Sequence, residues 1–337
     1  YQQALEVSTG SGSDRVAFSF SGRVECRDPV ATAPGTDLTY LARQSLKLRH
    51  GRDIDTRVNR AVTCNPVDHT GSSSNQIAVA IIPARYNSTR LPGKPLLQIG
   101  GKPLVLWVVE RALAARSVSR AIVATDDARI FDCVTSAGFE AAMTRERHAT
   151  GTDRIAEVAR DLDAEIIVNV QGDEPLIEPE TIDRAVSALV SDREAEIATT
   201  CEPIDDLADV LSRAVVKVVV DDDGRALEFS RGPIPFPGQA VSRHGSIEAA
   251  LEREPALLAT FRKHTGLYAY RREFLLKFTS WPQSEAERTE SLEQLRAVER
   301  GVRIRVVEAA SPSIGVDTID DLERVRAILE RHTQVTV

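Results

Sequence analysis

Three cationic side chains lie within the segment PARYNSTRLPGK (residues 83–94), which contains no acidic residue. They are Arg85, Arg90 and Lys94. A nucleoside triphosphate brings several negative charges close to its reacting phosphorus, and arginine and lysine are the side chains that neutralise phosphate oxygens. The glycine and small polar residues of the segment also permit turns with inward-facing amide hydrogens, which favour anions. The segment therefore predicts a triphosphate-binding loop, and the alternative is an ordinary basic surface loop.

Acidic residues that could hold a metal ion occur in two later segments, residues 169–175 (NVQGDEP) and residues 315–321 (GVDTIDD). Asp173 lies at the end of a predicted strand, where Mg²⁺ could bridge carboxylate and phosphate oxygens. Taken alone, Asp173 fits a common Gly-Asp turn and Asp317 fits a helix N-cap. Taken together, they predict Mg²⁺ ligands from opposite sides of one cleft. Gln171 is a neutral donor and acceptor that suits a polyhydroxylated substrate.

The elements that must position these residues alternate along the chain. Continuous apolar runs are typical of strands that are buried on both faces. The predicted strands are residues 77–82, 121–125, 166–170, 197–201, 215–220, 266–270 and 302–307. Predicted helices cover residues 104–115 and 318–331, and two more begin near residues 127 and 152. This alternation predicts an α/β fold with a mostly parallel sheet flanked by helices, which binds ligands beyond the C-terminal ends of its strands.

The composition excludes several classes of protein. The 337 residues are 42% hydrophobic and 27% charged, with a formal net charge of -8, so a general nucleic-acid-binding role is not expected. The four cysteines have no metal-ligand or disulfide-framework spacing, and free thiols are expected. No apolar run reaches membrane-spanning length, and no signal architecture opens the chain. We therefore expect a cytoplasmic protein without a membrane or nucleic-acid partner.

Residues 1–75 differ from the rest of the chain. They have weak hydrophobic periodicity and contain linker-like runs such as GSGSD and TGSSSNQ. We predict a poorly ordered or non-native extension, and a small accessory domain is the alternative. The catalytic domain is expected over residues 76–333.

Seven segments of the chain, taken in order, resemble the 3-deoxy-manno-octulosonate cytidylyltransferase family, also called CMP-Kdo synthetases. They are IIPARYNSTRLPGKPL, MTRERHATGTDR, VNVQGDEPLI, VKVVVDDDGRALEFSRGPIP, KHTGLYAYRREFL, TESLEQLR and IGVDTIDDLERVR. A collinear set is far more specific than any one motif. The resemblance covers roughly residues 77–332, although residues 236–262 do not align. The chain departs from the family's usual residues at Thr150, where serine is common, and at Arg288 and Thr289.

The resemblance implies a Rossmann-like nucleotidyltransferase fold with a smaller lobe at about residues 225–300 for sugar binding and dimer contact. It implies that a homodimer converts CTP and Kdo to CMP-Kdo and diphosphate for lipopolysaccharide biosynthesis. By similarity, Lys94, Asp173 and Asp317 are catalytic, and the two aspartates bind Mg²⁺. The implied CTP-binding residues are Arg85, Arg90, Lys94, Thr150, Gly151 and Thr152. The implied Kdo-binding residues are Gln171, Arg231, His264, Tyr268, Glu290 and Gln294.

Some of these residues have plain alternatives when they are read without the resemblance. Arg231 would be a surface arginine, although it is also the natural partner for the carboxylate of Kdo. His264 and Tyr268 would be a packed structural pair. A helix is expected to carry Glu290, Glu293 and Gln294 on a solvated face and to bury Leu292 and Leu295.

Other activities remain open at this stage. One is a cytidylyltransferase for an 8-amino Kdo analogue or another 2-keto acid sugar, and another is a nucleotide-binding protein without catalysis. The absence of a Walker A loop and of a GxGxxG fingerprint argues against a P-loop ATPase and a dehydrogenase.

Overall fold

The structure is a computed structural model that describes residues 77–87 and 90–335, with side chains described as far as residue 331. The described residues all belong to the unit Ser72–Val337. The predicted extension, residues 1–75, lies outside the described residues. Among the described helices, none is long and apolar enough to cross a membrane. Cys133 and Cys201 are free thiols, and the other two cysteines lie outside the described residues.

One nine-stranded sheet organises the described residues, with β11, β7, β10, β6, β1, β4 and β5 in that spatial order; β8 pairs with β10, and β9 pairs with β8. Its strands are β1 (Ala78–Ala84), β4 (Val118–Thr125), β5 (Glu140–Met143), β6 (Ile166–Asn169), β7 (Ile197–Pro203), β8 (Lys217–Val220), β9 (Ala226–Ser230), β10 (Arg262–Arg271) and β11 (Ile304–Glu308). A separate small ribbon pairs β2 (Gln98–Ile99) with β3 (Lys102–Pro103). The predicted strands are present, whereas β5 and β9 were missed because neither forms a continuous apolar run of buried residues.

The sheet is mostly parallel, as predicted. β1 pairs in parallel with β4 and β6, β4 with β5, and β7 with β11. β10 is antiparallel to both of its neighbours, β6 and β7. Before β10 begins, the chain returns to the end of β7 and then runs back along it. The hydrogen bond from Ile204 N to Phe261 O, at 3.2 Å, marks this point.

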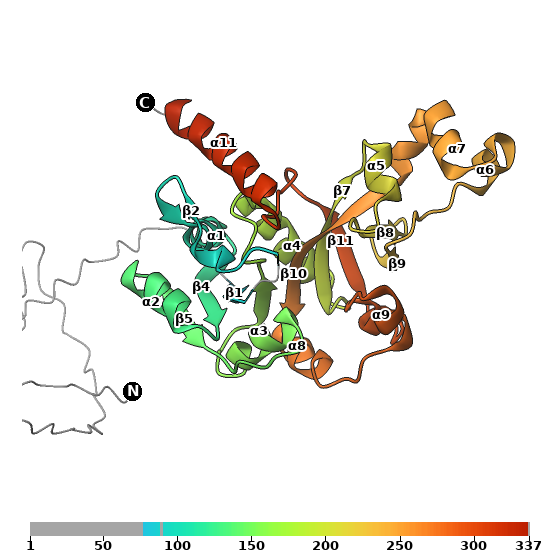
Figure 1. Cartoon of the computed structure of the whole chain (residues 1–337). Helices are drawn as coiled ribbons and strands as arrows, with labels where there is room; N and C mark the ends of the chain where they lie inside the picture. The colour runs from blue at the N-terminus through green and yellow to red at the C-terminus, as the bar shows by residue number, and fades with distance from the viewer. Residues whose placement is uncertain (1–76, 88–89, 336–337) are drawn as a thin grey trace, which may run out of the picture. The chain divides into compact units, whose positions relative to one another are not determined.

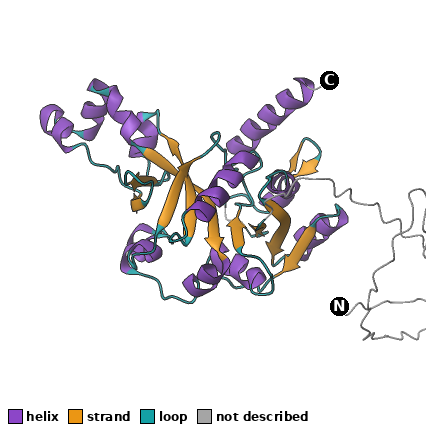
Figure 2. Cartoon of the chain, turned by 180° about the vertical axis from the view of Figure 1, so that it is seen from behind, coloured by secondary structure: helices purple, strands orange, loops and turns teal. Residues whose placement is uncertain are grey.

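Helices cover both faces of the sheet (Figures 1 and 2). They are α1 (Leu104–Leu113), α2 (Ala128–Ser136), α3 (Gly151–Ala159), α4 (Pro179–Ser191), α5 (Leu207–Leu211), α6 (Gly238–His244), α7 (Ile247–Arg253), α8 (Arg272–Phe278), α9 (Glu285–Glu290), α10 (Leu295–Val298) and α11 (Ile319–Val335). Two short 3₁₀ helices are η1 (Lys94–Leu96) and η2 (Pro255–Thr260). The side chain of Asp127 caps α2, as predicted.

Two apolar cores result from the alternation of side chains along the strands. In β1, Ala80 and Ile82 belong to the core formed with α1, α4 and α11. Val79 and Ile81 belong to the core formed with α3, α8 and α10. Both faces of β1 are therefore covered, which explains its continuous apolar run.

A small lobe lies beyond the sheet, where α5, α6 and α7 project together (Figure 1). Its own apolar cluster consists of Ile204, Val210, Leu251 and Phe261. The lobe predicted at about residues 225–300 overlaps this cluster, but it also takes in β10, which is a central strand of the main sheet.

Candidate active site

Three loops meet beyond the C-terminal ends of β1 and β6. Lys94 Nζ, at the start of η1, donates to Asp173 Oδ2 at 2.7 Å and to Asp317 Oδ1 at 3.0 Å. The loop after β6 touches the end of β1, because a Cβ atom added to Gly172 would lie 2.5 Å from the carbonyl oxygen of Pro83. The structure thus joins the predicted catalytic lysine to both predicted metal ligands.

The charges of this cluster stabilise one another. The Lys94 side chain is only 13% exposed. Although burial alone would lower its pKa, the Asp173 and Asp317 carboxylates raise the pKa of the Lys94 ammonium above its ordinary value. Arg90 Nη2 lies 3.1 Å from Asp317 Oδ2 at the exposed rim. Lys94 is therefore a cation near pH 7.

The predicted triphosphate loop closes on its own backbone. Gly93 N donates to Tyr86 O at 2.9 Å, and Gly93 has a φ of +68°, which favours glycine. The Tyr86 ring lies against Gly93, and the guanidinium of Arg129 lies 3.3 Å from the centre of the ring. A cation–π contact from α2 thus helps to hold the loop that carries the cationic residues.

A hollow of about 380 Å³ opens beside this loop. It is lined by Pro83, Ala84, Arg85, Asn87, Lys94, Pro95, Ala149, Thr150, Gly151, Gln171, Gly172 and Asp173. This phosphate hollow brings together most of the residues that were predicted for CTP and for the metal. Its basic side chains and backbone turns suit a polyphosphate.

A smaller hollow of about 180 Å³ adjoins the phosphate hollow, and the two share Gly151 and Gln171. Its lining is Gly151, Thr152, Asn169, Gln171, Tyr268, Tyr270, Glu293 and Gln294. Amide, hydroxyl and carboxylate groups with two aromatic rings suit a polyhydroxylated ligand, and we call this space the sugar hollow. Gln171 is fixed at its edge because its Nε2 donates to Gly266 O at 2.9 Å.

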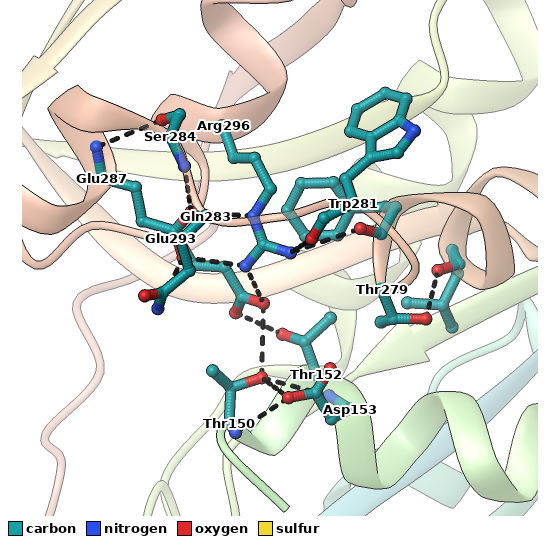
Figure 3. A network of polar contacts seen from close by, with 12 residues as sticks. Thr150, Thr152, Asp153, Thr279, Trp281, Gln283, Ser284, Glu287, Glu293 and Arg296 are labelled. Atoms are coloured by element: carbon teal, nitrogen blue, oxygen red, sulfur yellow. Dashed lines mark hydrogen bonds and ion pairs between the residues drawn. The ribbon is translucent and has the colours of Figure 1, made fainter.

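Figure 3 shows the contacts of Glu293 with the start of α3 and with Arg296. Thr150 caps α3 in a capping box with Asp153, and its hydroxyl also lies 3.3 Å from Glu293 Oε1. Thr152 Oγ1 donates to Glu293 Oε2 at 2.7 Å, and Arg296 Nη2 lies 3.3 Å from Glu293 Oε1. Burial raises the pKa of the Glu293 carboxyl, while Thr152 and the charge of Arg296 oppose this effect.

The prediction of one solvated helix around Glu290 is wrong. α9 ends at Glu290, Ser291 has a φ of +54°, and α10 begins only at Leu295. Glu293 and Gln294 therefore lie in the intervening turn, which faces the sugar hollow rather than solvent. The predicted burial of Leu292 and Leu295 is confirmed, at 5% and 6% exposure.

Three residues predicted for Kdo lie outside the lining of both hollows: Arg231, Glu290 and His264. The Arg231 guanidinium donates to the carbonyl oxygens of Glu290, Arg213 and Ser291 at 2.8, 3.0 and 3.4 Å. The Glu290 carboxylate accepts from Ser230 Oγ at 2.8 Å and from Arg231 N at 3.1 Å. Arg231 and Glu290 thus brace the turn that carries Glu293.

His264 lies behind Tyr268, with its ring centre 5.3 Å from that of the tyrosine. Burial lowers the pKa of His264 to about 3, so the ring is neutral near pH 7. The Thr199 hydroxyl donates to Leu267 O at 2.7 Å, which leaves its oxygen to accept from His264 Nε2 at 2.9 Å. His264 therefore supports the aromatic wall of the sugar hollow in this structure.

Three residues of the sugar hollow were not predicted as ligand-binding: Asn169, Tyr270 and Glu293. Asn169 lies opposite Tyr268 in the β6–β10 pairing, and Tyr270 lies two residues farther along β10. The two tyrosine rings stack with their centres 5.6 Å apart. The signal available for Asn169 was a polar residue at the end of an otherwise apolar strand.

The donor chemistry of Asp173 and Asp317 fits Mg²⁺, which prefers carboxylate oxygens and completes its shell with water and phosphate. The two carboxylates already converge on one cation, Lys94 Nζ. No cluster of three or more potential metal ligands occurs in the part of the chain that the structure describes. A divalent cation at this position would therefore depend on ligands from water or from a bound polyphosphate.

The sequence is similar to those of known cytidylyltransferases. A family model described as cytidylyltransferase matches residues 79–304. A 3-deoxy-manno-octulosonate cytidylyltransferase from Trichlorobacter lovleyi is 51% identical over 248 residues, which are 74% of this chain and 96% of the relative. The protein of the same description from Geobacter sulfurreducens is 52% identical over 246 residues, covering 73% and 96% of the two chains.

Solved structures agree with the sequence comparisons. CMP:2-keto-3-deoxy-manno-octonic acid synthetase complexed with CTP is 42% identical, with a TM-score of 0.68 over 76% of this chain and 99% of that chain. A cytidylyltransferase from Leptospira borgpetersenii is 16% identical with a TM-score of 0.50 over 76% of this chain and 87% of that chain, and it supports the fold alone. The predicted nucleotidyltransferase fold is thus confirmed.

Proposed function

Because the chain belongs to the 3-deoxy-manno-octulosonate cytidylyltransferase family, we propose that it converts CTP and 3-deoxy-manno-octulosonate (Kdo) to CMP-Kdo and diphosphate. It is a nucleotidyltransferase that activates Kdo for lipopolysaccharide biosynthesis. The observation that carries the assignment is that the phosphate hollow adjoins the sugar hollow. The two share Gly151 and Gln171. A triphosphate in the first would place its α-phosphorus near a sugar in the second.

The chemistry needs positioning more than covalent catalysis. The anomeric hydroxyl of Kdo attacks the α-phosphorus of CTP in line, and diphosphate leaves. Lys94, with Arg85 and Arg90 from the same loop, would hold the negative charge of the departing diphosphate. Thr150, Gly151 and Thr152, at the first turn of α3, would hold the cytidine end of CTP. Gln171, Tyr268, Glu293 and Gln294 would orient Kdo for the attack.

Asp173 and Asp317 are the residues that would hold Mg²⁺. When bound, the ion would supply positive charge at the phosphates and lower the pKa of the attacking hydroxyl. His264 is not suited to act as a general base, because its pKa is about 3 and its Nε2 is engaged by Thr199. The proposal therefore includes no side-chain base.

The assembly and location of the enzyme are also part of the proposal. We infer that it forms a homodimer and acts in the cytoplasm, as the resemblance to its family implies. The lobe formed by α5, α6 and α7 is the segment proposed for the dimer contact, and Phe236, just before α6, is 64% exposed. Sedimentation of the purified chain would reveal a single monomeric species if this part of the proposal is wrong.

Diphosphate release is the direct test of the activity. The chain is incubated with CTP, Mg²⁺ and a panel of acidic keto sugars that includes Kdo, its 8-amino analogue and a sialic acid. ATP, GTP and UTP replace CTP in parallel reactions. We expect release with CTP and Kdo and little with the other nucleotides. Preference for another sugar would change the acceptor, and no release with any sugar would overturn the catalytic function.

A further inference from the structure

The sugar hollow contains one buried polar atom that has no partner. Asn169 is 4% exposed and lines the hollow from the end of β6. Its Oδ1 makes no hydrogen bond to any of the described residues. A buried acceptor without a donor destabilises the folded state, and such atoms are rare in native proteins. Each one therefore needs a specific explanation.

Packing in the apolar core does not explain this residue. Asn169 lies next to Val168 on a strand whose other residues, Ile166 and Ile167, are apolar and fully buried. On β10, the residue directly opposite is Tyr268, so both side chains lie on the same face of the sheet. An aliphatic residue at position 169 would continue the strand without leaving an unpaired polar atom.

Several of the other polar side chains around the hollow have protein partners. Gln171 donates to Gly266 O, and Thr152 donates to Glu293. Glu293 in turn contacts Arg296. Among the residues that line the hollow, Asn169 carries the one fully buried side-chain atom that has no hydrogen-bond partner in the described part of the chain.

We propose that Asn169 is a specificity-determining residue, whose carboxamide binds one hydroxyl group of the acceptor sugar. This inference rests on the proposed function, because it assumes that the acceptor sugar occupies the hollow. A sugar hydroxyl suits this side chain because it both donates and accepts, so it can pair with the oxygen or with the NH₂ group of the carboxamide. A carbon that lacks this hydroxyl leaves the amide unpaired, so the residue selects against deoxy analogues of the substrate.

The proposal predicts opposite effects of one substitution on stability and on activity. Asn169→Leu replaces the amide by an apolar group of similar shape and removes the unpaired atom. The Tm of the ligand-free variant should be unchanged or higher by about 2–4 °C. Its KM for the sugar should rise about tenfold to a hundredfold, because the substrate hydroxyl loses its partner. The KM for CTP should change less than threefold.

Thr181→Val is the matched control, since it also exchanges a buried polar side chain for an apolar isostere. Thr181 is 1% exposed, and its Oγ1 accepts from Ala310 N at 2.9 Å. This variant should lower the Tm and leave both KM values unchanged. If Asn169→Leu behaves in the same way, Asn169 has only a structural role and the proposal is refuted.

A sugar analogue tests the same contact from the ligand side. Wild-type enzyme and Asn169→Leu are compared with Kdo and with analogues that each lack one hydroxyl group. For one analogue, the kcat/KM of the wild type should be lower than with Kdo by about the same factor by which Asn169→Leu lowers the kcat/KM for Kdo. The variant should then use this analogue about as well as it uses Kdo, because the contact is already lost. Full additivity with every analogue would overturn the assignment. Absence of wild-type activity with Kdo would instead refute the proposed function, while CTP-induced stabilisation of both proteins would show that each is folded.

Discussion

Replacing Asp173 by asparagine should separate the catalytic role of this residue from its structural role. Asp173 Oδ2 lies 2.7 Å from Lys94 Nζ, and its side chain is 31% exposed. The substitution keeps the size of the side chain and removes its charge. Lys94 still retains Asp317 at 3.0 Å, so the ammonium is not left without a partner.

The two expected magnitudes differ strongly. A hydrogen bond to a charged group contributes about 1.5–3 kcal/mol. Solvent screening at a partly exposed carboxylate reduces this, so we expect the free energy of unfolding to fall by only about 1 kcal/mol. The loss of one preorganised charge at the reacting phosphate should lower kcat by about 10²–10³-fold.

Diphosphate release under saturating CTP and Kdo measures kcat, and urea unfolding measures stability. Asp183→Asn is a suitable control, because Asp183 accepts from Ser117 N at 2.8 Å and from Ser117 Oγ at 2.7 Å outside both hollows. The control should lose stability and keep its kcat. Near-normal turnover by Asp173→Asn, or a loss of activity that merely follows the loss of folded protein, would refute the metal-site reasoning.

Three further substitutions test other parts of the site. Gly93→Ala should destabilise the chain by about 1–2 kcal/mol and raise the KM for CTP, because φ is +68° and the new Cβ would lie 3.2 Å from the Tyr86 ring; an unchanged KM would show that the loop does not hold the triphosphate. Arg231→Ala should lower the Tm and raise the KM for Kdo more than that for CTP, because the turn that carries Glu293 loses two hydrogen bonds, to Glu290 O and Ser291 O, and the link to Arg213 O is also lost; equal rises in both KM values would contradict this. Glu293→Gln removes a carboxyl whose pKa burial raises above its ordinary 4.5. Such a group stabilises the fold fully below pH 4.5, and this contribution is lost as the pH rises through the pKa of the folded state. Glutamine does not titrate. The free energy of unfolding of the variant should therefore increase relative to that of the native chain as the pH rises from 4.5 towards neutrality. A difference that does not change with pH would exclude a raised pKa.

Local sequence patterns predicted most of the strands of the sheet and several of the helices. The apolar run of β1 is buried by helices on both faces of the sheet, and the cap at Asp127 starts α2. The strand β5 was not predicted. It lies at the edge of the sheet, where a strand needs no continuous apolar run. The break at Ser291 was also missed, because a left-handed residue other than glycine has no strong sequence signal.

For the site, the sequence by itself determined which chemical groups are available: a cationic loop, two acidic loops and a set of polar residues that resemble one family. Only the tertiary structure decided which of them meet. Lys94 contacts carboxylates that are 79 and 223 residues away along the chain. Such contacts depend on strand order and on which strand end each loop follows, and no local pattern encodes either. The same cause brings Asn169 and Glu293 into the sugar hollow and turns Arg231 onto backbone carbonyls, since the direction of each side chain is set by the strand or turn that carries it.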